Sequence, residues 1–223
     1  ALWHVCYRPG VRKSVKGEEV AAELIPGVHV DLLKALHLLT RDGDLNADSR
    51  RKLKQVNHLL GLLRPAIEDV LARFGDPVIV DCGAGKGYLG FLLHDAFLRK
   101  AGKGTIVCVE SREDLVRAAE ERAKGLGMTR MTFVHGEIES AAVPERIHLL
   151  TALHACDTAT DDAMLLALRG NADYVALVPC CQAEVARQLA EAKTPAASPM
   201  GPLFEHAWHR REFGSHLTNV VRA

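Results

Sequence analysis

Apolar residues follow two alternating patterns over the last two thirds of the chain. Short apolar runs predict buried strands, and longer segments with apolar residues every three or four positions predict helices. Strands are predicted over 77–82, 104–110, 131–138, 146–156 and 172–180, and helices over 87–102, 112–127, 158–170 and 183–192. Strands and helices that alternate in this way form a mostly parallel sheet with helices on both faces. We therefore expect an α/β, Rossmann-like fold.

The two ends of the chain have different patterns. Residues 1–75 have helical periodicity over 21–43 and 49–74, which predicts an N-terminal helical extension before a sheet domain at 76–223. Asp48 or Ser49 would cap the second helix, and Pro65 would kink or divide it. Near the C-terminus, 203–213 and 216–223 are predicted to pair as antiparallel strands, which would complete a seven-stranded sheet. The Pro- and Ala-rich stretch 193–202 is predicted to be a loop.

The composition is that of a globular protein with no strong electrostatic bias. The 223 residues are 48% hydrophobic and 25% charged, with a formal net charge of zero, so no global field attracts nucleic acid. No apolar run approaches the roughly 20 residues that span a bilayer, and the N-terminus lacks the apolar core of a signal peptide. The six cysteines include no CxxC pair, and Cys82 and Cys108 lie in strand-like runs as predicted core residues. This usage favours a cytoplasmic location over a disulfide framework.

The first predicted strand runs directly into a glycine-rich turn, VIVDCGAGKGYLG (78–90). Three nucleotide-binding patterns compete for it. A phosphate loop fails, because Lys86 precedes Gly87 and no Ser or Thr follows. A dinucleotide pattern GxGxxG fits from Gly85 to Gly90, but it places the turn about two residues into the helix. The pattern DxGxGxG, from Asp81 to Gly87, is typical of S-adenosylmethionine-dependent methyltransferases.

Acidic residues also end the next two predicted strands. Glu110 could accept both hydroxyls of a ribose, and Glu137 would suit the exocyclic amine of adenine. Each acid alone could be a helix cap or a solvated strand end. Together with the glycine turn they predict an S-adenosylmethionine site formed by Asp81, Gly83, Ala84, Gly85, Lys86, Gly87, Glu110, Ser111, Gly136, Glu137, Ile138 and Leu153.

Three motifs together resemble a known methyltransferase family. They are DCGAGKGYLGFLL, ALHACDTATDDAM and VPCCQ, and the resemblance extends from about Lys52 to the C-terminus. The family includes a eukaryotic tRNA ribose 2′-O-methyltransferase, methyltransferase-like proteins and a protein that also has a glutathione-transferase-like domain. The resemblance implies a class I methyltransferase fold, S-adenosylmethionine as cofactor and methyl transfer. Relatives often have Gly where Asp157 stands, so the tRNA activity is not carried over.

Acceptor chemistry is expected at the end of the fourth predicted strand, because in this fold that strand ends beside the methyl group. His154 could act as a general base, Asp157 could orient it, and Cys180 completes the predicted catalytic set. Two alternatives remain open: a zinc site formed by His154 with Cys156, Cys180 and Cys181, and a cysteine nucleophile that attacks a pyrimidine ring. The simplest alternative is that the cysteines only shape the pocket, and no metal is predicted.

The sequence leaves the methyl acceptor open. Arg50, Arg51, Lys52 and Lys54 could lie near a polyanion, which together with the tRNA-modifying relative favours RNA. Zero net charge and an aromatic content of 5% favour a protein or small-molecule acceptor. A non-catalytic cofactor-binding module is the third possibility. Asn57 and His58 could reach the cofactor pocket from the same helix, and the oligomeric state is not indicated.

Overall fold

The structure is a computed structural model that describes residues 4–5, 24–153, 155, 158–178, 184–192 and 199–222. Six strands in this part of the chain form one sheet, in the order β1-β6-β5-β2-β3-β4. Their bounds are β1 His4–Val5, β2 Val78–Cys82, β3 Thr105–Glu110, β4 Met131–His135, β5 Leu149–Ala152 and β6 Tyr174–Leu177. Strands β2 to β6 are parallel, and the two-residue β1 joins β6 in antiparallel orientation.

The five predicted parallel strands are therefore confirmed. β2 lies at the centre of these five strands. β3 and β4 extend the sheet on one side of β2, and β5 and β6 extend it on the other side. Asp81, near the end of β2, lies opposite Cys108 of β3 and Thr151 of β5. The carboxyl ends of these three strands meet at one edge, where open α/β sheets bind ligands.

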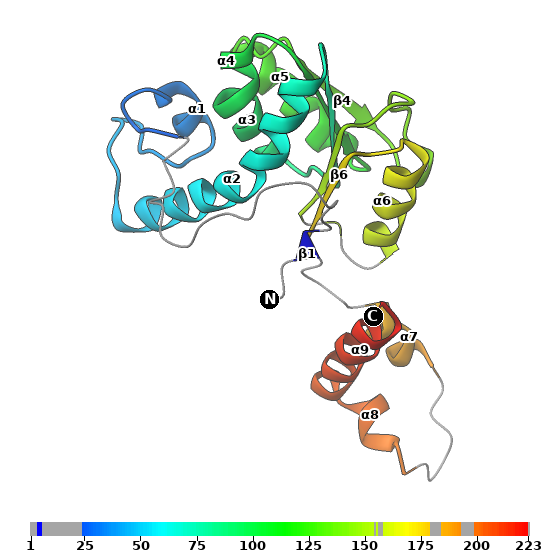
Figure 1. The fold of residues 1–223 in the computed structure, drawn as a ribbon. Helices are drawn as coiled ribbons and strands as arrows, with labels where there is room; N and C mark the ends of the chain where they lie inside the picture. Colours follow the sequence, from blue (N-terminus) through cyan, green and yellow to red (C-terminus); the bar gives the residue numbers. More distant parts are fainter. Residues whose placement is uncertain are drawn as a thin grey trace.

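Helices cover both faces of this sheet (Figure 1). Alternate residues along each strand face opposite sides, and they divide into two buried clusters. One cluster contains Ile79 and Cys108 with helix residues such as Leu60, and the other contains Val80 and Val109 with residues such as Leu166. The helices are α1 Val30–Ala35, α2 Ala47–Arg73, α3 Tyr88–Leu93, α4 Arg99–Ala101, α5 Glu113–Gly125, α6 Thr158–Arg169, α7 Glu184–Glu191, α8 Gly201–Glu205 and α9 Ala207–Arg222.

The helix predicted over 87–102 is confirmed with one irregularity. A π-helical turn, η1 (His94–Leu98), connects α3 to α4, and the helix ends at Gly102, whose φ is 65°. A short 3₁₀ turn, η2 (Ile138–Ser140), follows β4. Cys82 and Cys108 are both free and about 1% exposed, which confirms the prediction that they are core residues.

The first long helix begins earlier than its sequence suggested. Asn46 is the N-cap of α2, and its side chain accepts a hydrogen bond from the Ser49 amide, so the prediction of Asp48 or Ser49 as cap was wrong. Pro65 does not divide α2, which is one helix over 27 residues. The predicted helix over 21–43 is confirmed only as the six residues of α1. The division of the chain at residues 75 and 76 stays a prediction.

Asn57 of α2 has a role that its sequence position did not indicate. Its side-chain oxygen accepts from the Leu24 amide at 2.8 Å, and its amide nitrogen donates to the Leu24 carbonyl at 3.2 Å. The two bonds fasten the segment before α1 to α2. That Asn57 and His58 reach the cofactor pocket stays a prediction, and His58 is exposed on the same helix.

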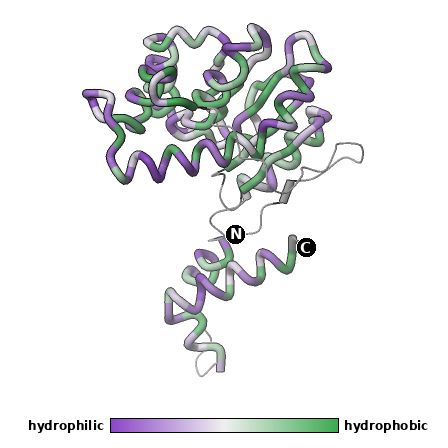
Figure 2. The backbone as a smooth tube through the Cα atoms, turned by 60° about the vertical axis from the view of Figure 1, so that its left-hand side comes forward, coloured by the Kyte–Doolittle hydropathy of each residue, from purple (hydrophilic) through white to green (hydrophobic). Residues whose placement is uncertain are grey.

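The C-terminal strands predicted over 203–213 and 216–223 are wrong. These residues form α8 and α9, and the described residues give a six-stranded sheet instead of seven strands. Packing against α7 explains the difference, because a Cβ on Gly214 of α9 would lie 2.9 Å from the Ala186 backbone nitrogen. The helices α7 to α9 form a group beside the sheet domain (Figure 1), and hydrophobic and hydrophilic stretches alternate along them (Figure 2).

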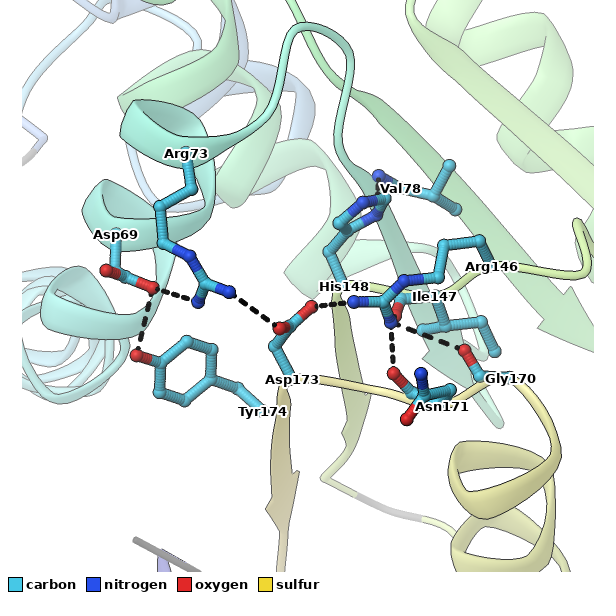
Figure 3. A network of polar contacts seen from close by, with 10 residues as sticks. All are labelled: Asp69, Arg73, Val78, Arg146, Ile147, His148, Gly170, Asn171, Asp173 and Tyr174. Atoms are coloured by element: carbon cyan, nitrogen blue, oxygen red, sulfur yellow. Dashed lines mark hydrogen bonds and ion pairs between the residues drawn. The ribbon is translucent and has the colours of Figure 1, made fainter. Parts of the chain in front are cut away.

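Charged residues fasten α2 to the amino-terminal edge of the sheet (Figure 3). Asp173, which precedes β6, accepts from Arg73 of α2 at 3.2 Å and from Arg146. Arg73 also donates to Asp69 at 2.8 Å, and the Tyr174 hydroxyl donates to the same carboxylate at 3.1 Å. This network lies at the end of the strands opposite the glycine-rich turn. Among the residues described, no helix has the length and apolar character needed to cross a membrane.

Candidate functional site

The glycine-rich turn after β2 has a backbone that requires glycine. Gly83, Gly85 and Gly87 have φ values of 65°, 57° and 75°, which L-residues with a side chain rarely adopt. The turn is held from β3 as well as from within, because the Ala84 amide donates to the Val109 carbonyl at 2.9 Å. Its amide groups and the amino end of α3 therefore lie at the carboxyl edge of the sheet. Lys86 is exposed there.

Glu110 is the side chain that joins the turn to the end of β3. Its Oε2 accepts a hydrogen bond from the Gly85 amide at 2.7 Å. Its Oε1 accepts from the Arg112 amide at 3.1 Å and from Arg112 Nε at 3.3 Å. Glu110 is only 8% exposed, so these bonds to the carboxylate form in a largely desolvated place. The sequence placed Glu110 in the site, and the structure brings it directly against the glycine turn.

Asp81 lies deeper than its place in the motif suggested. It is buried in the sheet, and its Oδ1 accepts from the Thr151 hydroxyl of β5 at 2.8 Å. Burial raises the pKa of Asp81 to about 7, and the Thr151 hydrogen bond only partly opposes this effect. Asp81 is therefore a carboxyl group that changes its charge near neutral pH behind the glycine turn.

The end of β4 contributes mainly backbone to this edge. The Gly136 amide donates to the Glu110 carbonyl at 3.1 Å, and His135 Nε2 lies 3.0 Å from the Ser111 carbonyl oxygen. The side chains of Ser111 and Glu137 are exposed, while Ile138 is buried in the second hydrophobic cluster. The structure thus gathers the predicted residues at the ends of β2, β3 and β4 along one edge.

The end of β5 also comes to the glycine turn. A Cβ on Gly83 would lie 3.5 Å from the Cα of Ala155, so the two backbones are close neighbours. Leu153, two residues earlier, is half-buried and packs on the first hydrophobic cluster. The predicted catalytic residues His154, Asp157 and Cys180 lie outside the described residues, as do Pro179, Cys156 and Cys181 of the motifs. In the part that is described, no three His, Cys, Asp or Glu side chains are grouped to hold a metal ion.

Three residues around the turn were missed by the sequence analysis. Thr151 holds the Asp81 carboxyl, Arg112 contacts Glu110, and Arg122 of α5 donates to the Lys86 carbonyl at 3.1 Å. A lone hydroxyl within the apolar run LLTAL, and a basic residue two places after the strand-end acid, were the available signals. The sequence contains no signal for Arg122, because helical spacing does not reveal a contact with a distant turn.

Comparison with known proteins shows to which family the chain belongs. A family model described as a methyltransferase domain matches residues 51–188, more than half of the chain. The chain belongs to this methyltransferase domain family. The matched residues of the methyltransferase domain include the glycine turn, Glu110 and the β5 motif. Its fold is an α/β Rossmann-like fold with a parallel sheet flanked by helices.

Curated relatives of this methyltransferase domain are glutathione S-transferase C-terminal domain-containing proteins. The Xenopus laevis protein is 29% identical over 59% of this chain, and the Drosophila melanogaster homolog is 32% identical over 50% of it. The chain spans about a fifth of the length of each, 19% and 18% respectively. Among solved structures, a SAM dependent methyltransferase from Aquifex aeolicus is similar, with 19% identity, a TM-score of 0.38, and 74% of this chain and 86% of that chain covered.

Proposed function

We propose that this methyltransferase domain binds S-adenosylmethionine at the carboxyl edge of its sheet and transfers the methyl group. The position of Glu110 carries the proposal. Its carboxylate is fixed at the end of β3, bonded to the Gly85 amide and only 8% exposed. An acid in that position, next to backbone that can approach a ligand closely, suits a ribose with two neighbouring hydroxyl groups.

The residues present fit this cofactor. Three of the five residues over 83–87 are glycines with positive φ, so at these positions no side chain stands between the backbone and a ligand. Asp81 and Glu110 supply negative charge for a ligand that carries a sulfonium and an ammonium group. The proposed cofactor residues remain Asp81, Gly83, Ala84, Gly85, Lys86, Gly87, Glu110, Ser111, Gly136, Glu137, Ile138 and Leu153.

S-adenosylmethionine supplies a methyl group bound to a positively charged sulfur. The chain itself then has to align the acceptor, exclude water and remove the proton of a weak acceptor. We propose His154 as the base, with Asp157 orienting it and Cys180 beside it. The contact of Ala155 with Gly83 supports this assignment, because it brings the backbone next to His154 to the cofactor turn.

We propose RNA as the acceptor and the cytoplasm as the location. Arg50, Arg51, Lys52 and Lys54 are all exposed on the first turns of α2. Asp48 neutralises part of this charge, since it lies 2.6 Å from Lys52 Nζ and 4.0 Å from Arg51. That pairing favours the alternative, a protein or small-molecule acceptor. A domain that binds the cofactor without turnover is the third candidate.

Calorimetric titration with S-adenosylhomocysteine tests the cofactor site. We expect binding by the unaltered chain and a loss of affinity of at least about tenfold in Glu110→Ala, because even one bond to a charged acceptor contributes roughly 1.5–3 kcal/mol. Glu139→Ala, an exposed acid of the neighbouring η2 turn, is the matched control. Equal affinity in Glu110→Ala, with an intact fold by circular dichroism, would refute the assignment of Glu110.

Transfer of a radiolabelled methyl group from S-adenosylmethionine to cell extract tests the acceptor. Label that nuclease releases supports RNA, and label that only protease releases supports a protein acceptor. Binding without label transfer to any fraction supports the non-catalytic module. His154→Ala should abolish transfer while the affinity for S-adenosylhomocysteine stays the same.

A further inference from the structure

The Glu110 carboxylate is already occupied on both oxygens by groups of the chain itself. Oε2 accepts the Gly85 amide at 2.7 Å, while Oε1 accepts the Arg112 amide at 3.1 Å and Arg112 Nε at 3.3 Å. A carboxylate offers about four lone-pair positions, two on each oxygen. Oε1 therefore has no free lone-pair position, and Oε2 has one.

A ribose with two neighbouring hydroxyls brings two donors to this carboxylate. One hydroxyl finds the remaining position on Oε2, and the second needs a position on Oε1. The two amide donors are fixed by the glycine turn and by the start of α5, for which Arg112 is the N-cap residue. Only the guanidinium group can move away without a change in the backbone.

We propose that Arg112 Nε and a ribose hydroxyl of the cofactor compete for the same position on Glu110. Binding then exchanges an internal ion pair for a bond to the ligand. The inference rests on the proposed function, since it concerns the same cofactor. Arg112 acts through Glu110 and is a positioning residue.

The two side chains differ in the way that this exchange requires. The side chain of Arg112 is 66% exposed, and that of Glu110 is 10% exposed. Because the guanidinium is solvated, its release costs little, and exposed ion pairs contribute at most about 1 kcal/mol. The carboxylate, in contrast, would lose a partner in a desolvated place. Arg112 therefore keeps Glu110 paired when no ligand is bound, and it competes with the ligand.

Titration of S-adenosylhomocysteine into the chain and two variants tests the competition. Removal of the competitor in Arg112→Ala should tighten binding by up to about fivefold. Arg112→Lys keeps the charge without the Nε donor, so its affinity should lie between those of the unaltered chain and Arg112→Ala. The difference between Arg112→Ala and the unaltered chain should shrink as salt screens the ion pair. Arg117→Ala is the control, because this arginine of α5 is also exposed and pairs with Glu113 at 3.7 Å.

A ligand with one ribose hydroxyl removed distinguishes competition from a general effect on the fold. The 2′-deoxy and 3′-deoxy forms of S-adenosylhomocysteine each bring one donor, and only one of the two forms keeps the hydroxyl that needs the position on Oε1. We expect the unaltered chain and Arg112→Ala to bind the other form equally, while the form that keeps this hydroxyl should still bind more tightly to Arg112→Ala.

Weaker binding in Arg112→Ala would overturn the inference, since it would mean that the guanidinium orients Glu110 for the ligand. Equal binding of S-adenosylhomocysteine by the two proteins would also overturn it. These results are distinct from a failure of the proposed function, in which the unaltered chain itself would not bind S-adenosylhomocysteine.

Discussion

Thr151 donates its side-chain hydroxyl to Asp81 Oδ1 at 2.8 Å, across the β5–β2 pair, and both residues are buried. The two positions are 70 residues apart in the chain. Asp81 has the buried thiols Cys82 and Cys108 as its titratable neighbours, and burial raises the pKa of Cys82 to about 12, so both stay neutral at physiological pH. The charge of this interior therefore depends on Asp81.

Stability should fall as pH rises through the pKa of Asp81. Its pKa is raised from 3.8 to about 7, so the folded state binds a proton more tightly than the unfolded state. The stabilising contribution is complete below pH ~4 and is lost as pH rises to 7 and above. At about 1.4 kcal/mol for each pKa unit, the loss is on the order of 4 kcal/mol at most. Urea unfolding of the chain and of Asp81→Asn at pH 5 and pH 8 measures it, and an equal pH dependence in the two proteins would contradict the prediction.

The affinity for S-adenosylmethionine should rise with pH over the same range. A cationic ligand favours the ionised form of Asp81, so binding below pH 7 has to release a proton. We expect up to about tenfold weaker binding for each pH unit below the pKa. In Asp81→Asn the affinity should follow only the ionisation of the ligand, which makes this variant the control in a calorimetric series from pH 6 to 8. A series for the unaltered chain parallel to that of Asp81→Asn would count against the prediction.

Thr151→Val should raise the pH at which the stability and the cofactor affinity change. The Thr151 hydrogen bond lowers the pKa of Asp81, so its loss lets burial raise that pKa above 7. The midpoint of the affinity series should move to higher pH, and Thr151→Ser, which keeps the hydroxyl, should leave it in place. An unchanged midpoint in Thr151→Val would show that the hydroxyl does not control the ionisation of Asp81.

Gly90→Ala should destabilise the fold by about 1–3 kcal/mol, because it overpacks the contact between α3 and β3. A Cβ at this position would lie 2.7 Å from Cys108 Sγ and 3.0 Å from Met131 Cε. Gly125→Ala, where no atom lies within 4 Å of the added Cβ, should be neutral or slightly stabilising. The double variant with Cys108→Ala should recover part of the loss in urea unfolding. A failure to recover any stability would place the strain somewhere other than at Cys108.

Asp173→Ala should destabilise the amino-terminal edge of the sheet without an effect on cofactor binding. The Asp173 side chain is 5% exposed and pairs with both Arg73 and Arg146. Its removal leaves two arginines without this partner, which we expect to cost about 2–4 kcal/mol in unfolding free energy. Glu113→Ala, an exposed acid 3.7 Å from Arg117, should cost less than about 1 kcal/mol. Weaker binding of S-adenosylhomocysteine in Asp173→Ala would contradict the separation of the two edges.

The sequence by itself determined the order of the parallel strands and helices and the position of the glycine turn. Buried strands, amphipathic helices and glycine turns have local signals, because the residues that form them are neighbours in the chain. Glu110 was found for the same reason, since an acid at the end of a parallel strand necessarily lies at the ligand-binding edge.

Only the tertiary structure decided which side chains meet at that edge and how the chain ends. Thr151 and Asp81 come together through strand register, and Arg122 reaches the Lys86 carbonyl from 36 residues away. The β-branched residues near the C-terminus favoured strands locally, yet the close approach of Gly214 to Ala186 packs this segment as a helix against α7. These outcomes depend on contacts between distant parts of the chain, which outweigh the local preferences that a sequence displays.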